Sequence, residues 1–212
     1  MTRVVHYFKM ELVKGQTEIF DRVGRKNFKT SLHTEPGTLV MLAGREKNPL
    51  NAHVFEVYAD QAAYEAHRKS SQFQAYVDQV GQHVKKRELF DLKEEAFFEK
   101  EGTLKALDGQ VLVRVQKVMT SGWFIEEFYE SVMEQLPRAF QRSEELVGLY
   151  ATTMLEDPRV WYFFEIYRIE KDKKPSTVRY LNGTMNMLNL KAVWKLESSF
   201  VVRQGITRKK WR

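Results

Sequence analysis

The sequence predicts an α+β protein in which one β-α-β-β-α-β unit occurs twice. Strand-like and helix-like hydrophobic periods follow one another in that order over residues 3–98 and again over residues 110–203. Two fragments also recur with one common offset. Phe55–Tyr58 (FEVY) returns as Phe164–Tyr167 (FEIY), and Asn48-Pro49 returns as Asp157-Pro158. A shared offset at two separated places indicates duplication. The predicted fold is therefore a tandem of ferredoxin-like domains.

The strands and helices of the first half follow from these periods. Strands are expected at residues 3–12, 38–44, 52–59 and 88–98. A helix is expected from about Thr17 to Leu32, because its apolar residues form one stripe. Asp60 is expected to cap a short helix that ends near Lys69. Ser71 is expected to cap another, whose apolar stripe continues to Val84.

The second half repeats the order. Strands are expected at residues 110–118, 146–155, 160–169 and 194–203, and helices at residues 122–136 and 176–190. Pro137 is expected to end the first of these helices or to start a new turn. Residues 99–109 show no hydrophobic periodicity and are rich in charged residues, which is typical of a linker. The predicted domains are residues 1–98 and 110–203, followed by a basic tail at residues 204–212.

Composition allows two small cores and excludes several kinds of site. The chain has 212 residues, of which 43% are hydrophobic, and it has no cysteine. Disulfides, thiol nucleophiles and cysteine-ligated metals are therefore excluded. The net charge is +6, but five Lys and Arg residues and no acid lie within residues 203–212. This pattern favours a solvated tail over a nucleic-acid-binding face, although Trp211 keeps a docking role open.

The sequence also predicts the compartment. The N-terminal residues alternate apolar and polar side chains and lack the apolar core of a signal peptide. No uncharged apolar stretch approaches the length of about eighteen residues that a membrane span needs. We therefore expect a cytoplasmic protein without a membrane or nucleic-acid partner.

A run of short motifs in the first half points to a family. The motifs are Asn48-Pro49, Phe55–Tyr58, Asp60, Ala63–Phe73 (AYEAHRKSSQF) and Lys86–Phe90. In this order they resemble the antibiotic-biosynthesis-monooxygenase family, and especially the branch with quinol monooxygenases and autoinducer-2-degrading enzymes. The resemblance covers about residues 3–97, whereas the second half matches only in architecture and in its FEIY strand.

The resemblance implies how the two halves assemble. Family members are usually dimers in which two sheets pack face to face into an α/β-barrel. Two tandem copies would build this barrel within one chain. The physical argument agrees, because a sheet with helices on one face leaves its other face apolar and in need of cover. Besides this pairing within one chain, two whole chains could also form a homodimer.

His67 is the first candidate for catalysis. It lies four residues after Ala63 on the second helix, so it points inward or to the helix edge. Imidazole can take or give a proton near neutral pH. The resemblance places His67 at a position that lines the family's pocket. The alternative is a helix histidine bonded to backbone.

Asn27 and Tyr64 complete the predicted catalytic set. Asn27 falls on the apolar stripe of the first helix, and a buried amide must be paired. It could hold a developing oxyanion, which the resemblance favours, or clasp the neighbouring loop. Tyr64 could donate a hydrogen bond to a substrate carbonyl. The predicted substrate-binding residues are Tyr58, Phe73, Tyr76 and His53, and packing is the alternative for each aromatic side chain.

No metal or cofactor is expected. His6 and His53 could share a sheet face near His67, but no HxH or HExxH spacing supports a metal site. Haem-degrading relatives carry a histidine ten residues after an aromatic residue on the second helix. Counting from His67 leads to Val77, and the early asparagine of that subgroup falls near Phe8. The resemblance therefore does not extend to haem cleavage.

The second half is expected to lack the chemistry of the first. All five histidines lie in residues 1–100, and Ser176 stands where the repeat would place His67. A second pocket could instead use Tyr180, Asn182 or Asn186. Glu56 recurs as Glu165, and this repetition favours a structural role such as a salt bridge across the pseudo-dimer.

Three functions remain open at this stage. The first is a cofactor-independent monooxygenase that oxidises a small quinol, anthrone or other phenol with O₂. The second is an isomerase or lyase acting on a phosphorylated carbonyl compound. Its cationic anchors would be Arg25, Lys26, Arg68 and Lys69. The third is a non-catalytic pseudo-dimer that binds haem or an apolar ligand.

Overall fold

The chain divides into two compact units. The computed structural model describes residues 2–46, 48–100, 111–120 and 122–168, and the backbone of residues 194–201 and 207–208. Unit 1 comprises residues 1–92 with residues 102–111 and 200–212. Unit 2 comprises residues 93–101 and 112–199.

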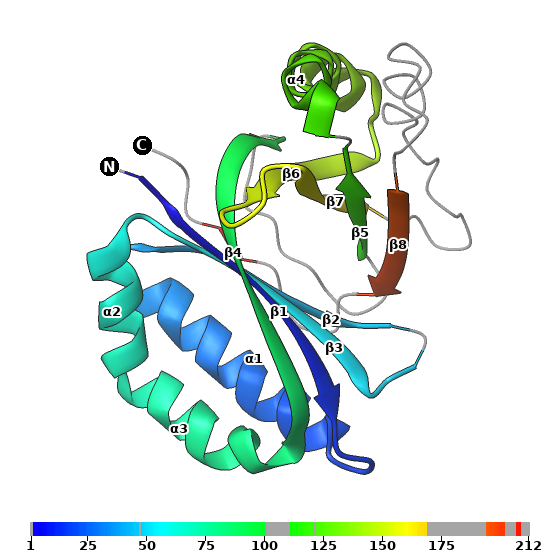
Figure 1. The fold of residues 1–212 in the computed structure, drawn as a ribbon. Coiled ribbons are helices and arrows are strands. Elements are labelled where there is room, and N and C mark those ends of the chain that lie inside the picture. Colours follow the sequence, from blue (N-terminus) through cyan, green and yellow to red (C-terminus); the bar gives the residue numbers. More distant parts are fainter. Residues whose placement is uncertain are drawn as a thin grey trace. The chain divides into compact units, whose positions relative to one another are not determined.

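Unit 1 is a four-stranded antiparallel sheet with helices on one face (Figure 1). Its strands are β1 (Val4–Leu12), β2 (Thr38–Arg45), β3 (Asn51–Tyr58) and β4 (Val84–Glu99). Its helices are α1 (Thr17–Thr34), α2 (Gln61–Lys69) and α3 (Ser71–Val80). The spatial order β2-β3-β1-β4 is that of a ferredoxin-like fold, with α2 and α3 in place of the second helix.

Alternation along the strands decides which side chains meet the helices. Met10 and Leu12 of β1 and Val54 of β3 pack with Phe20 and Val23 of α1 in one core. The neighbouring residues of each strand point to the opposite face. His6 lies an even number of positions from Met10 on β1, and Glu56 and Tyr58 lie an even number of positions from Val54 on β3. All three side chains are therefore on the helix side, where His6 pairs with Glu56 across the two strands.

Two details of the helices differ from the sequence prediction. Asp60 caps α2 as expected, and its side chain accepts a hydrogen bond from the Ala63 amide at 2.8 Å. The cap of α3, however, is Ser70 and not Ser71, because the Ser70 hydroxyl accepts from the Phe73 amide. The helix ends at Val80, and Val84 begins β4 instead of extending the apolar stripe.

Unit 2 repeats the first part of this arrangement. Its elements are β5 (Val111–Met119), a short 3₁₀ turn (Gly122–Phe124), α4 (Ile125–Arg142), β6 (Leu146–Met154), β7 (Val160–Arg168) and β8 (Trp194–Val201). The strand order is β6-β7-β5-β8, with the last residues of β4 beside β6. The helix expected at residues 176–190 lies outside the described residues, as do Ser176, Tyr180, Asn182 and Asn186.

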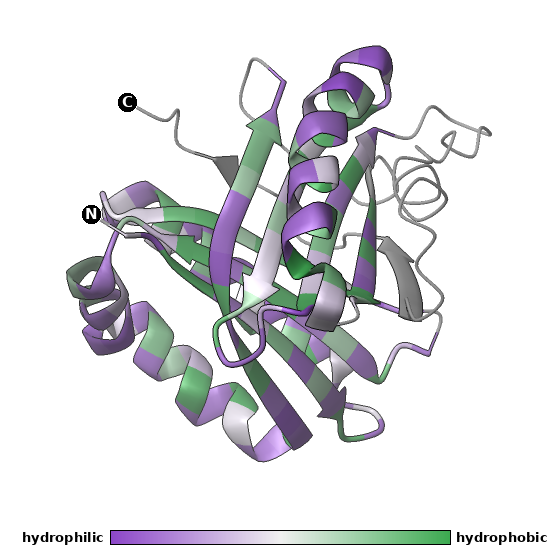
Figure 2. Cartoon of the chain, turned by 45° about the horizontal axis from the view of Figure 1, so that its top comes forward, coloured by the Kyte–Doolittle hydropathy of each residue, from purple (hydrophilic) through white to green (hydrophobic). Residues whose placement is uncertain are grey.

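The prediction that Pro137 ends a helix or starts a new turn is wrong. Pro137 lies inside α4, which continues to Arg142. The helix buries Leu136 and Phe140, one turn apart, in the core of unit 2. This burial offsets the one hydrogen bond that a proline removes. Figure 2 shows hydrophilic and hydrophobic residues alternating along α4, as expected of a helix with one buried face.

The predicted fold class, a tandem of ferredoxin-like α+β domains, is confirmed. Most of the predicted linker lies outside the described residues, but Glu99 is the last residue of β4. Two residues of the predicted tail, Thr207 and Arg208, form strand β9 and pair with Met41 and Val40 of β2. In the described part of the chain, no helix is long and apolar enough to cross a membrane.

Candidate functional site

His67 on α2 forms a buried pair with Glu35. The imidazole is fully buried, and its Nδ1 atom lies 2.9 Å from Oε2 and 3.2 Å from Oε1 of Glu35. An ionised carboxylate can only accept a hydrogen bond, so Nδ1 carries the proton. In the neutral imidazole the lone pair is then on Nε2. This Nε2 atom is buried and has no hydrogen-bond partner among the described residues.

Several hydrogen-bond donors converge on the Glu35 carboxylate. Besides His67, Thr38 Oγ1 donates to Oε2 and Gln72 Nε2 donates to Oε1, each at 2.5 Å. Burial works against a charge on Glu35. The hydrogen bond from Thr38 and the adjacent His67 outweigh it and hold the pKa of this carboxyl below its usual range. The pair is therefore an imidazole oriented by a carboxylate.

A tight turn brings these residues together. Glu35 follows α1 directly, and Gly37 comes just before β2. A Cβ atom on Gly37 would lie 2.3 Å from the Cβ of Ala63, so only glycine lets the turn approach α2 this closely. The Gly37 carbonyl also accepts from the Ala59 amide at 2.8 Å. Since Ala63 lies one turn before His67, this contact sets the distance from His67 to Glu35.

Aromatic rings surround the His67 side of this pair. The aromatic cluster consists of His6, Tyr58, Tyr64, His67, Phe73 and Tyr76. Ring centroids are 4.8 Å apart for His67 and Phe73, 5.4 Å for His67 and Tyr58, and 5.2 Å for Tyr58 and Tyr64. Phe73, Tyr64 and Tyr76 are partly exposed, so the cluster reaches the surface of unit 1. Neither the Tyr64 nor the Tyr76 hydroxyl has a hydrogen-bond partner among the described residues.

A second carboxyl, Glu56, lies beneath the aromatic cluster. Its Oε2 atom accepts from the Tyr58 hydroxyl at 2.8 Å. Burial raises the pKa of Glu56, and the nearby His67 and the bond from Tyr58 offset only part of this effect. Burial and the adjacent Glu56 raise the pKa of Tyr58 well above its usual value.

Asn27 is buried as predicted, but it joins the site indirectly. Its Oδ1 atom accepts from the Ser31 hydroxyl, and Ser31 in turn accepts from Gln72. Gln72 then bonds to Glu35, so a chain of side chains leads from Asn27 to His67. The oxyanion role of Asn27 stays a prediction.

His53 lies apart from the other predicted residues. The suggestion that His6 and His53 share a sheet face is wrong. His6 pairs with Glu56, and His53 lies three positions before Glu56 on β3, an odd number that places its side chain on the opposite face. The Nδ1 atom of His53 forms a hydrogen bond with the Tyr7 hydroxyl at 2.7 Å. Its Nε2 atom lies 2.7 Å from the Glu46 carboxylate. Burial lowers its pKa, although Glu46 partly offsets this effect.

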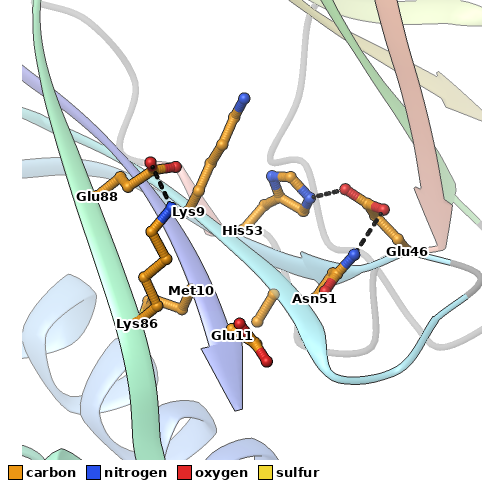
Figure 3. Close-up of a pocket in the computed structure, with 9 residues that line it drawn as sticks. Lys9, Met10, Glu11, Glu46, Asn51, His53, Lys86 and Glu88 are labelled. Carbon is orange, nitrogen blue, oxygen red and sulfur yellow. Dashed lines mark hydrogen bonds and ion pairs between the residues drawn. The ribbon is translucent and has the colours of Figure 1, made fainter.

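A hollow of about 210 Å³ adjoins His53 on this opposite face. Lys9, Lys86, Glu88, Glu46 and Asn51 contribute to its wall, and Figure 3 shows these side chains around His53. Charged residues of both signs line the hollow, in contrast to the aromatic surroundings of His67. Among the residues that the structure describes, no group of three or more His, Asp or Glu side chains could hold a metal ion.

The predicted cationic anchors do not converge on His67. Arg25 lines a separate surface hollow together with Arg22 and Arg45. Arg68 lies over the Tyr64 ring, with 5.8 Å from its guanidinium carbon to the ring centroid. Lys26 and Lys69 are exposed.

Unit 2 has a different arrangement at the matching place. Glu165 accepts from the Tyr167 hydroxyl at 2.7 Å, as Glu56 does from Tyr58. Glu165 is also ion-paired with Arg114, whose Nε lies 2.6 Å away, and it accepts from Gln116. This ion pair lies inside unit 2, whereas the prediction was a salt bridge across the pseudo-dimer. Glu56 takes part in no ion pair with a described residue.

Glu35, Gln72 and Thr38 are site residues that the sequence prediction missed. Glu35 was interpreted only as part of a turn. A signal was present, since an antiparallel pairing of the second and third strands places the start of one beside the end of the other. Thr38 indeed pairs with Tyr58, and so the turn before β2 lies next to the start of α2.

The fold and this site define a small α/β domain with an oriented, buried imidazole beside aromatic rings. Residues 3–79 match the family model described as antibiotic biosynthesis monooxygenase. Unit 1 therefore contains a domain of the antibiotic biosynthesis monooxygenase family, as the motifs predict. No curated protein matches the chain.

Solved structures share the fold of the whole chain. A candidate monooxygenase from Lactobacillus acidophilus is 20% identical, with a TM-score of 0.79 over 99% of this chain and 100% of its own. One from Fusobacterium nucleatum is 16% identical, with a TM-score of 0.82 over 98% and 95%. An anthrone oxidase-like protein is 7% identical, with a TM-score of 0.59 over 99% and 95%. At these identities the likeness establishes the fold alone.

Proposed function

We propose that unit 1 is a cofactor-independent monooxygenase that oxidises a small quinol, anthrone or other phenol with O₂. The observation that carries this proposal is the buried, unpartnered Nε2 atom of His67. Its ring is oriented by Glu35 and lies against Phe73 and Tyr58. Such a lone pair in apolar surroundings is placed to accept a proton from a phenol or from a carbon beside a carbonyl.

The chemistry follows from the order of these groups. His67 takes the substrate proton, and the Glu35 carboxylate stabilises the resulting imidazolium. The electron-rich substrate anion then reacts with O₂ between aromatic rings that exclude water. Tyr64, whose hydroxyl has no hydrogen-bond partner among the described residues, donates to the substrate oxygen. The partly exposed rings of Phe73 and Tyr76 stack with a flat aromatic substrate.

Oxygen uptake by the purified full chain tests the proposal. The anthrone oxidase-like protein that shares the fold makes anthrone the first substrate to try, with hydroquinone as the second. We expect His67→Gln to lower kcat by about 10²- to 10⁴-fold, the usual contribution of a general base. The matched control is His33→Ala, because His33 is exposed at the end of α1.

The two variants together separate a catalytic role from a structural one. His33→Ala should keep the wild-type rate, and circular dichroism should show that both variants are folded. Equal turnover by wild type and folded His67→Gln would rule out His67 as the base. Absence of oxygen uptake by the wild type with every quinol and anthrone tried would rule out the function.

A further inference from the structure

The two units contain the same carboxyl and hydroxyl pair in different surroundings. In each unit a glutamate on the third strand of the repeat accepts from the tyrosine two residues later, at 2.8 Å in unit 1 and 2.7 Å in unit 2. All four side chains are buried. The difference between the units is therefore in the other neighbours of the carboxyl group.

In unit 2 the carboxylate is neutralised. Arg114 forms an ion pair with Glu165, and its guanidinium also lies 3.4 Å from the Tyr167 hydroxyl and over that ring. Gln116 donates to the remaining carboxylate oxygen at 2.5 Å. A buried carboxylate with an arginine and two further donors is stable in its ionised form.

In unit 1 no arginine or lysine occupies this place. His6 is the partner of Glu56 on β1, and His67 and Tyr64 face it from α2. Tyr76 of α3 and the ionised Glu35 also act on it through space. Among the described residues, only the Tyr58 hydroxyl forms a hydrogen bond with the Glu56 carboxyl group. A buried carboxyl without a cation is more stable as the neutral acid.

We propose that Glu56 is held as a neutral carboxylic acid and is the proton donor of the monooxygenase reaction in unit 1. This inference rests on the proposed function and assigns it a second reacting group. The base and the acid then have opposite environments, since Glu35 keeps its charge beside His67 whereas Glu56 keeps its proton. Pairs of ionisable groups with diverging environments are typical of acid–base sites.

The proton of Glu56 is needed when product forms. Addition of O₂ to the substrate anion gives a carbon-bound peroxide anion, which takes the first proton back from the His67 imidazolium and becomes a hydroperoxide. His67 Nε2 removes the remaining proton from that carbon, and the electron pair of the C–H bond forms the new carbonyl. The O–O bond breaks, and the departing hydroxide takes the proton of Glu56 and leaves as water. Proton return from the imidazolium to the Glu56 carboxylate restores both groups.

Infrared spectroscopy tests the protonation state without any substrate. A neutral carboxylic acid has a carbonyl stretching band that a carboxylate lacks. At neutral pH we expect the wild type to show this band and Glu56→Gln to lack it. Glu56→Gln keeps the shape of the side chain and can still accept from Tyr58. The matched control is the double variant Arg114→Met/Glu165→Gln, which removes both partners of the buried ion pair and should leave the band unchanged because Glu165 is ionised. A wild-type spectrum without the band, or a band that survives in Glu56→Gln, would overturn the proposal.

A second variant tests the local geometry. Tyr58→Phe removes the hydrogen bond that stabilises ionised Glu56, so its pKa should rise further. The infrared band should then persist to a higher pH than in the wild type. Loss of the band at a lower pH in this variant would contradict the assignment to Glu56.

Measurements of oxygen uptake distinguish a wrong role for Glu56 from a wrong assignment of monooxygenase activity. With anthrone, Glu56→Gln should lower kcat by about 10²-fold or more while KM changes little. Equal kcat in Glu56→Gln and the wild type would remove the role of Glu56 and leave the proposed function standing. A wild type that shows the band but consumes no oxygen would overturn the function and the proton-donor role with it.

Discussion

The stability of variants at Glu35 tests how the imidazole of His67 is held. Glu35 accepts hydrogen bonds from Thr38, Gln72 and His67. In Glu35→Ala the Thr38 hydroxyl and the His67 Nδ1–H lose their acceptor, and both side chains are fully buried. Gln72 is only half-buried and can turn to water. An unsatisfied buried donor costs about 1–3 kcal/mol. We therefore expect Glu35→Ala to lower the free energy of unfolding by about 2–6 kcal/mol.

Glu35→Gln should cost less. The amide oxygen can replace Oε2 and accept from Thr38 and His67, and the Gln72 amide can flip to accept from the new NH₂ group. Only the contribution of the charge is lost, which is about 1 kcal/mol. Urea denaturation measures both values, with Glu65→Ala on the exposed face of α2 as the control. The reasoning fails if Glu35→Ala is no less stable than Glu35→Gln.

The difference between Glu35→Gln and the wild type should also depend on pH. The pKa of Glu35 is lowered in the folded state, so its stabilisation is fully present above the unfolded carboxyl pKa of about 4.3. It is lost as the pH falls through the lower folded value. The two proteins should therefore differ most near neutral pH and approach each other in acid. A difference that grows as the pH falls would have the wrong sign.

Two further substitutions test the packing of each unit by denaturation. Gly37→Ala should destabilise unit 1 by about 1–3 kcal/mol, because its new Cβ would overlap that of Ala63, and Ala63→Gly in the same chain should recover part of the loss. Recovery of none would argue against this contact. Arg114→Met should cost about 3–5 kcal/mol by leaving Glu165 charged and buried, and adding Glu165→Gln should restore stability. A double variant as unstable as Arg114→Met alone would refute this account.

Local patterns were sufficient to predict the fold. Alternation of apolar and polar residues placed β1 and β3 correctly, and Asp60 was identified as a cap from its position before an apolar helix. The prediction failed where packing outweighs a local rule. Pro137 is tolerated because Leu136 and Phe140 bury the helix on both sides of it. Such compensation cannot be read from the proline itself.

Only some residues of the candidate site could be predicted from the sequence. His67 and its aromatic neighbours could be found because their motif is continuous along the chain. Glu35 comes from a turn 32 residues earlier and meets His67 only through strand pairing. The difference in surroundings between Glu56 and Glu165 was hidden because the repeated letters are identical. What distinguishes them is Arg114, on a strand 51 residues away from Glu165.

Strand β4 limits where this protein can be cut. Up to Leu92 it pairs with β1 of unit 1. From there on its residues belong to unit 2, where Glu95 bonds to Thr153 and Glu99 to Tyr150. A unit 2 fragment that begins after residue 100 lacks the neighbour of β6, whereas a unit 1 fragment that stops at residue 100 carries an unpaired extension. The two units thus share one backbone element, and expression of either unit alone requires a redesigned terminus.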